Sequence, residues 1–212
     1  MIDNFKSLSI GKYMEIQQLA KDESLDELTF QVKVLAILAD KSEDEILSLP
    51  LGEYTALVRK SRFLEAKEPD VIKVADKYNL GGLVLVPTKD IRKITTAQYI
   101  DFQEWNKQGS EEHMVEILSC FLVPSGKKYN DGYDIIEVQE AIRENMCVAE
   151  VLGLIAFFLQ VWQRSIAISL HFSKREARKM KDKEKREEML KRIRTQETLL
   201  HHDGDGLSMW MQ

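Results

Sequence analysis

The chain has 212 residues, of which 44% are hydrophobic and 31% are charged, and its formal net charge is −5. This composition can bury a core, and it excludes a disordered or collagen-like chain. The length allows one large domain or two small ones, and the negative net charge gives no overall attraction to nucleic acid.

Charge is unevenly distributed along the chain. Residues 174–194 hold 11 Lys or Arg and 5 Asp or Glu, a local balance of +6, whereas residues 1–173 hold 19 basic and 27 acidic residues, a balance of −8. The basic segment therefore needs a separate interpretation from the rest of the chain.

The cysteines and the longest apolar run both indicate the protein interior. Cys120 and Cys147 lie in apolar contexts, which predicts buried thiols in a reducing cytoplasm and no disulfide framework. The first 20 residues carry no basic segment followed by an apolar core, so we expect no signal peptide. The apolar run Val151 to Leu159 would span only about 14 Å as a helix, so it predicts a core helix and no membrane span.

Two helices are predicted at the N-terminus, the first over residues 11–21 and the second ending near Ala39. Ser24 and Glu27 have the spacing of a capping box, in which a hydroxyl and a carboxylate each accept a backbone N–H. The run from Leu28 onward alternates as a strand would and also fits helical spacing. Its unbroken length favours the helix.

A second capping box is predicted at Ser42 and Glu45, at the start of a helix of about two turns that ends before Pro50. Residues 51–66 then keep helical spacing. Helices joined by short loops predict a compact N-terminal helical subdomain over residues 1–68.

Residues 69–92 form a different kind of segment. Gly81 and Gly82 separate two short β-prone runs, which predicts a β-hairpin near residues 71–87.

Residues 93–172 predict a helical core subdomain. The last of its helices is apolar almost all round, so we expect it at the centre of the fold. The expected helices are one capped by Thr95 and Gln98, one from Met114, one capped by Asp134 and Glu137, and one from Val148 to Phe172.

Residues 173–212 predict a charged helix over 173–200 and a frayed tail. Apolar residues are sparse in this helix, and opposite charges four residues apart support an exposed position. The expected fold class is mainly α: a multi-helix bundle with a small β-hairpin insertion and a long charged C-terminal helix.

Signatures of catalysis are missing from the sequence. It holds no phosphate-binding glycine loop, no dinucleotide fingerprint, no nucleophile elbow, no CxxC and no HExxH. The ligand-rich tail around His201, His202, Asp203 and Asp205 favours a solvated segment over a metal site, because glycines flank it. We therefore expect no enzyme, no catalytic residue, no metal and no cofactor.

Two groups of charged residues in the core subdomain leave alternatives. Glu137, Glu140 and Glu144 predict a solvated helix face in preference to an acid/base pair. Arg164 lies within an apolar helix, where its charge needs a partner; it either reaches an edge or a carboxylate, or it serves an ion pair in assembly.

The basic segment gives the candidate binding residues. Nucleic-acid binding would follow from phosphate contacts, but five acidic residues are interleaved along the helix and no aromatic residue accompanies it. A solvated or protein-docking helix is therefore favoured. The candidate partner-binding residues are Lys174, Arg175, Arg178, Lys179, Leu190, Ile193 and Trp210.

A series of short phrases over most of residues 7–160 resembles tail assembly chaperone-like proteins of tailed bacteriophages and related phage proteins. The phrases are SLSIGKYMEI (7–16), VLAIL (34–38), SEDEI (42–46), LPLGEY (49–54), ITTAQYIDF (94–102) and VPSGKKY (123–129).

The resemblance implies a non-enzymatic helical protein that escorts the tape-measure protein during tail assembly, in the host cytoplasm. The long charged C-terminal helix departs from the simplest members, so a structural or internal component retained in the virion is an alternative. A nucleic-acid-associated phage protein using residues 174–194 is the second alternative. The implied partners are tape-measure, tail or virion proteins and further copies of the chain, and no membrane.

Overall fold

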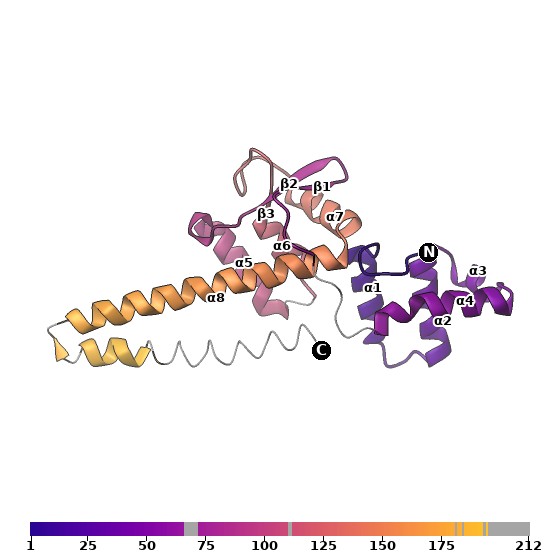
Figure 1. The fold of residues 1–212 in the computed structure, drawn as a ribbon, viewed down its shortest axis with the longest axis horizontal. Helices are drawn as coiled ribbons and strands as arrows, with labels where there is room; N and C mark the ends of the chain where they lie inside the picture. The colour runs from indigo at the N-terminus through magenta and orange to yellow at the C-terminus, as the bar shows by residue number, and fades with distance from the viewer. Residues whose placement is uncertain (66–71, 110–111, 181, 184, 193, 195–212) are drawn as a thin grey trace. The chain divides into compact units, whose positions relative to one another are not determined.

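The computed structural model describes residues 1–65, 72–109, 112–180, 182–183, 185–192 and 194, and it is mainly helical, as predicted (Figure 1). One small sheet accompanies the helices. The elements are α1 (Ile10–Ala20), α2 (Glu27–Ala39), α3 (Glu43–Leu47), α4 (Leu51–Ser61), η1 (Arg62–Glu65), β1 (Tyr78–Leu80), β2 (Leu83–Pro87), η2 (Ile91–Lys93), α5 (Thr96–Gly109), α6 (Met114–Phe121), β3 (Leu122–Pro124), α7 (Ile135–Asn145) and α8 (Val148–Lys179).

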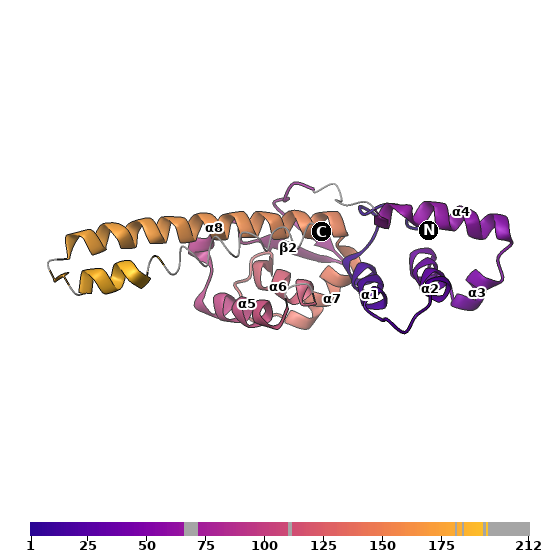
Figure 2. The ribbon, with the colours of Figure 1, turned by 90° about the horizontal axis from the view of Figure 1, so that it is seen from below.

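The chain forms two compact units. Unit 1 comprises Met1–Thr88 and Arg92–Ile155, and unit 2 comprises Lys89–Ile91 and Ala156–Gln212. Unit 1 contains α1 to α7, the sheet and the first turns of α8 (Figure 2).

Two capping boxes form as predicted. The Ser42 backbone N–H donates to Glu45 Oε2 at 2.8 Å, and the Glu45 N–H donates to Ser42 Oγ at 3.2 Å. Thr95 and Gln98 make the same reciprocal pair at 2.9 and 3.2 Å. Each box satisfies two backbone donors that a helix start would otherwise leave free, so these helices begin where their side chains specify.

The predicted capping box at Ser24 and Glu27 is wrong. Asp26 caps α2 instead, because its carboxylate accepts the Thr29 backbone N–H at 2.9 Å and the Thr29 hydroxyl at 2.7 Å. The Ser24 hydroxyl donates to Asp22 at 2.6 Å. A carboxylate is a stronger acceptor than a hydroxyl, and these hydrogen bonds lower the pKa of Asp26.

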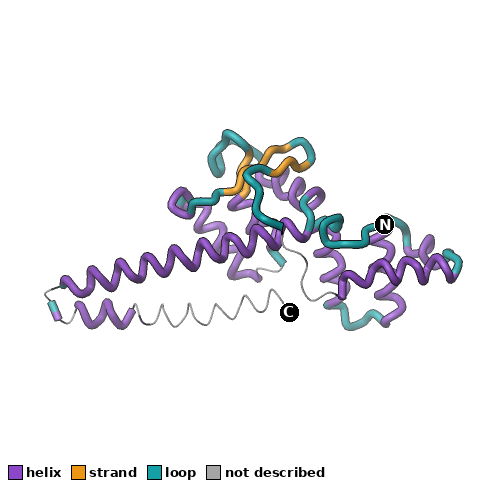
Figure 3. Tube along the Cα trace, in the orientation of Figure 1, coloured by secondary structure: helices purple, strands orange, loops and turns teal. Residues whose placement is uncertain are grey.

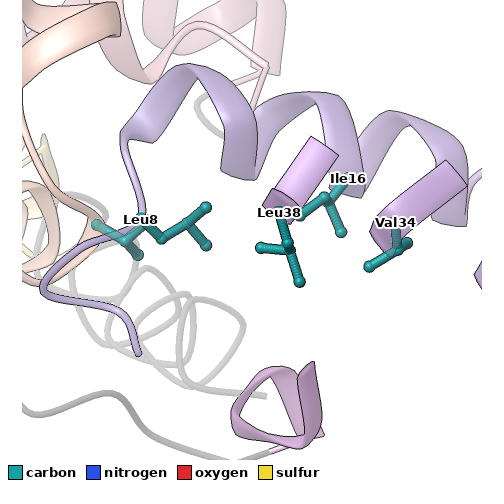
Figure 4. Close-up of a cluster of buried hydrophobic side chains, with 5 residues drawn as sticks. Leu8, Ile16, Val34 and Leu38 are labelled. Carbon is teal, nitrogen blue, oxygen red and sulfur yellow. The ribbon is translucent and has the colours of Figure 1, made fainter. Parts of the chain in front are cut away.

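Helix α2 is confirmed as a helix, and it is packed on two sides. Figure 4 shows Val34 and Leu38 on one side meeting Leu8 and Ile16. On its other side α2 contributes to a second cluster, which α3 and α4 complete. The buried members of that cluster are Val32, Leu35, Ala36 and Ile46. Burial on both sides explains why the apolar residues of α2 fit a strand pattern as well as a helical one.

The segment before α1 pairs with the turn between α7 and α8. The Ile10 N–H donates to the Met146 carbonyl at 2.9 Å, and the Val148 N–H donates to the Leu8 carbonyl at 2.9 Å. This antiparallel bridge holds Val148 in the same buried cluster as Leu8. The N-terminal helices are thereby joined to the helices that follow the sheet.

The β-hairpin is confirmed, and it has a partner strand that the sequence did not indicate. Strands β1 and β2 pair antiparallel across Gly81 and Gly82, whose φ angles of +55° and +95° suit a two-residue hairpin turn. Strand β3 adds to the other edge of β2, with Val86 opposite Val123 (Figure 3). Three residues are too few to show a strand period, so the sequence pattern does not indicate β3.

Helix α6 is the most completely buried of the described helices of unit 1, and the start of the helix from Val148, which the sequence predicts to be central, is buried as well. Seven of the eight residues of α6 are buried, including Leu118 and Phe121, and it contacts both α5 and α7. Among the described side chains of α8, Val148, Val151 and Leu154 are buried near its start, and Ala177 is buried near its end. Phe157 and Phe158 are half-buried. The apolar run from Val151 is therefore most deeply buried up to Leu154, and the residues from Ile155 to Phe158 are half-buried.

The predicted helix boundary between Phe172 and Ser173 is wrong, because α8 continues to Lys179. The composition changes there from apolar to charged, but neither glycine nor proline lies between Phe172 and Lys179, so the backbone continues as a helix. A break does occur near Asp182, whose carboxylate accepts the Lys185 N–H at 3.2 Å. Residues 185–192 are helical again.

Gly11 allows the close approach of α1 and α7. A Cβ at this position would lie 2.8 Å from the backbone oxygen of Arg143. We expect Gly11→Ala to lower the free energy of unfolding by about 1–3 kcal/mol, because the backbone at Arg143 must shift. Urea denaturation followed by circular dichroism measures the change.

Gly52→Ala is the matched control. Gly52 also lies in a helix, and a Cβ at this position would meet no atom within 4 Å. Helix propensity alone should make this control neutral or stabilising by about 1 kcal/mol. Equal stability changes for the two variants would contradict the proposed close approach.

Candidate functional site

The structure places the predicted partner-binding residues in unit 2. Lys174 is half-buried, whereas Arg175, Arg178 and Lys179 are exposed in the last turns of α8. Leu190 is half-buried in the helical residues 185–192. Ile193 and Trp210 lie outside the described residues, as do Lys181 and the side chain of Arg164.

The end of α8 and residues 185–192 form a helical hairpin in unit 2. The two helices lie side by side in both views of the ribbon (Figures 1 and 2). Ala177 is fully buried, and Met180, Met189 and Leu190 are half-buried. These apolar residues thus have a packing role. The predicted single helix over 173–200 is interrupted, because its described residues belong to the end of α8 and to a separate helical stretch over 185–192.

The opposite side of α8 is exposed and basic. With 3.6 residues per turn, the exposed residues of the last turns fall within about a third of the helix circumference. Lys179 pairs with Glu176 at 2.7 Å, whereas Arg175 and Arg178 form no ion pair with any described residue. We call this surface the basic outer face: His171, Phe172, Arg175, Arg178 and Lys179.

An aromatic side chain does accompany the basic residues. Phe172 is 62% exposed and lies less than one turn before Arg175 on the same face. The predicted boundary at Phe172 had assigned it to a different helix, so the expectation that no aromatic accompanies the basic helix is wrong. An exposed aromatic beside two arginines has the composition of a binding surface.

The three glutamates of α7 are solvated, as predicted. Glu137, Glu140 and Glu144 are all exposed. Ile136, at the start of the same helix, is 59% exposed. The buried side of α7 is formed by Val138, Ala141 and Ile142.

Both cysteines are free thiols, and Cys120 is buried as predicted, while Cys147 is only half-buried. Burial raises the pKa of the Cys120 thiol to about 12. The Tyr129 hydroxyl donates to Asp101 at 2.7 Å and lies 3.9 Å from the Cys120 sulfur. Burial and the bond to Asp101 raise the pKa of Tyr129 as well. The Tyr129 hydroxyl thus connects the loop after β3 to Asp101 of α5 and to Cys120 of α6.

Two open grooves lie on unit 1. One, of about 860 Å³, lies along α1 and α2 and is bordered by the ion pairs Lys12–Asp40 and Lys33–Glu43, the second at 2.7 Å. The other, of about 640 Å³, lies along α5 and includes two exposed apolar side chains, Tyr99 and Ile100. Its remaining lining residues are Gln103, Glu104, Lys107 and Gln108.

The described residues contain no group of three or more His, Cys, Asp or Glu side chains placed to hold a metal ion. The ligand-rich cluster His201, His202, Asp203 and Asp205 lies outside the part of the chain that the structure describes. Within that part, none of the helices has the length and apolar character needed to cross a membrane.

Cys120 should stay protonated and unreactive in the folded protein. With a pKa of about 12, only about one thiol in 10⁴ is ionised at pH 8, and the labelling rate should rise about tenfold per pH unit while the pH stays below that pKa. The Cys147→Ser variant isolates Cys120, and we expect its labelling by a disulfide reagent at pH 8 to be at least about 100-fold slower than after unfolding. Fast labelling of the folded variant would contradict this burial.

No protein-family model, curated protein or solved structure matches this chain. The surfaces described above are therefore the structural basis for proposing its function.

Proposed function

We propose that the protein acts in bacteriophage tail assembly through protein–protein contacts and without catalysis, as an escort of the tape-measure protein. The resemblance of short sequence phrases to tail assembly chaperone-like proteins suggests the process. The exposed apolar surface along α5 is the observation that carries the proposal, because it suits the binding of a helical polypeptide.

The groove along α5 has the composition of a helix-binding surface. Ile100 is 55% exposed and Tyr99 is 44% exposed, and polar side chains of α5 surround them. An amphipathic client helix can place an apolar residue against Ile100 and pair its polar flanks with Glu104 and Lys107. Tyrosine adds a large contact area at a small cost in side-chain entropy.

A second apolar surface lies where α3 meets α4. Leu47 and Leu51, on either side of Pro50, are 64% and 79% exposed. Single exposed leucines are common on protein surfaces, but two large ones within one turn of chain are typical of a contact region. Two separate apolar surfaces suit a long client better than a small ligand.

Co-expression of the full chain with the tape-measure protein of the same phage tests the proposal. We expect the two proteins to co-purify, and Ile100→Asp to reduce the apparent affinity about tenfold by placing a charge in the apolar contact. Asn106→Asp, which adds the same charge at an exposed position of α5 outside the groove, should have no effect.

Purified phage particles provide the second measurement. Absence from particles together with tape-measure binding supports an escort. A fixed copy number in particles would replace the proposal by the virion-component alternative. Binding to duplex DNA at about 50 mM salt without tape-measure binding would favour the nucleic-acid alternative, because phosphate contacts are strongest at low salt.

A further inference from the structure

We propose that the basic outer face of α8 binds the α7 surface of a second copy of this chain. The proposal concerns self-association and is independent of the proposed phage role. It rests on two exposed helix faces of the same chain. Each face has one large apolar side chain followed by charged side chains, and the charges are positive on one face and negative on the other.

The first face presents one large apolar group followed by cations. Phe172 is 62% exposed, and Arg175 and Arg178 are exposed one and two turns further along. Neither arginine forms an ion pair with a described residue. Arginine and aromatic side chains are enriched at the centres of protein interfaces, where they supply much of the binding energy.

The second face presents one large apolar group followed by anions. Ile136 is 59% exposed, and Glu140 and Glu144 lie one and two turns further along α7. Glu137 is exposed on the same third of the helix, and so is Arg143, whose guanidinium pairs with Glu116 at 3.5 Å and leaves the three glutamates in excess. None of these glutamates forms an ion pair with a described residue. We call this surface the acidic α7 face.

The two faces complement each other in charge and in spacing. On the basic outer face, the two arginines follow Phe172 by three and six positions. On the acidic α7 face, Glu140 and Glu144 follow Ile136 by four and eight positions. Both spacings follow the helical period, so the charged residues lie on the same side of the helix as the apolar one. The charge of the whole chain has the same asymmetry, +6 over residues 174–194 and −8 over residues 1–173. A copy of the chain therefore carries the partner for its own basic face.

A protein partner fits the basic outer face better than nucleic acid does. Glu176 lies next to this face and pairs with Lys179 at 2.7 Å, and Glu188 pairs with Arg192 at 2.7 Å in the second helix of the hairpin. A phosphate backbone would meet these carboxylates as well as the arginines. An acidic helix with one apolar residue uses Phe172 and the unpaired arginines alone.

Contact between different surfaces of two copies is heterologous, so it produces rings or open chains unless two copies exchange both contacts in a dimer. Either way, association depends on protein concentration. Exposed ion pairs are screened by salt, so association should weaken between about 50 mM and 500 mM NaCl.

Charge reversal of the full chain tests the contact. The arm variant changes the basic outer face and carries Arg175→Glu and Arg178→Glu. The helix variant changes the acidic α7 face and carries Glu140→Lys and Glu144→Lys. Sedimentation velocity should show an association constant reduced about tenfold or more in each variant alone, because attraction becomes repulsion. An equimolar mixture should recover association, because the unchanged basic outer face of the helix variant can bind the unchanged acidic α7 face of the arm variant.

The control variant carries Arg59→Glu and Lys60→Glu, two exposed positions at the end of α4. It makes the same charge change as the arm variant and should associate like the unmodified chain. Far-ultraviolet circular dichroism verifies that all the variants keep their helices.

Three results would overturn the proposal: an unmodified chain that stays monomeric at every concentration and salt, a mixture that fails to recover association, or a control variant that loses it equally. Duplex DNA binding that the arm variant loses, in the absence of self-association, would assign the basic outer face to nucleic acid. Tape-measure binding by the arm variant is measured in parallel, so failure of self-association and failure of the phage role are separate results.

Discussion

Two backbone hydrogen bonds, which join residues 8–10 to residues 146–148, determine how unit 1 is built. They connect parts of the chain more than 130 positions apart and place Val148 among the side chains of the N-terminal helices. Because Gly11 carries no Cβ, α1 can then approach α7 closely. Without this bridge the N-terminal helices would contact the rest of the unit mainly through side chains.

Local signals predicted much of the fold. The capping boxes at Ser42 and Thr95 and the turn at Gly81 act over two to four residues, so the sequence contains all that is needed to find them. Strand β3 depends on its pairing with β2, whose residues lie more than 30 positions earlier in the chain, and a pattern along the chain does not contain that neighbour. The competition between Asp26 and Ser24 shows that spacing alone does not choose between two nearby caps.

The candidate surfaces were predicted less well than the helices that carry them. The sequence located the basic residues Arg175 and Arg178, and the solvated glutamates of α7 were expected correctly. Phe172 was separated from the arginines because a change in composition was taken for the end of a helix. Exposure is a tertiary property: Ile100, Ile136 and Phe172 are as apolar as core residues, and only the packing around them leaves them accessible.

The burial of α2 on two sides bears on how the sequence can diverge. From Thr29 to Ala39 every side chain is buried or half-buried, so hardly any position of this helix is free to vary without repacking a neighbour. Helix α4 has no buried residue and tolerates change far more easily. Among descendants of a common ancestor, α2 should therefore change more slowly than α4, and its apolar residues should help to detect distant relatives of this chain.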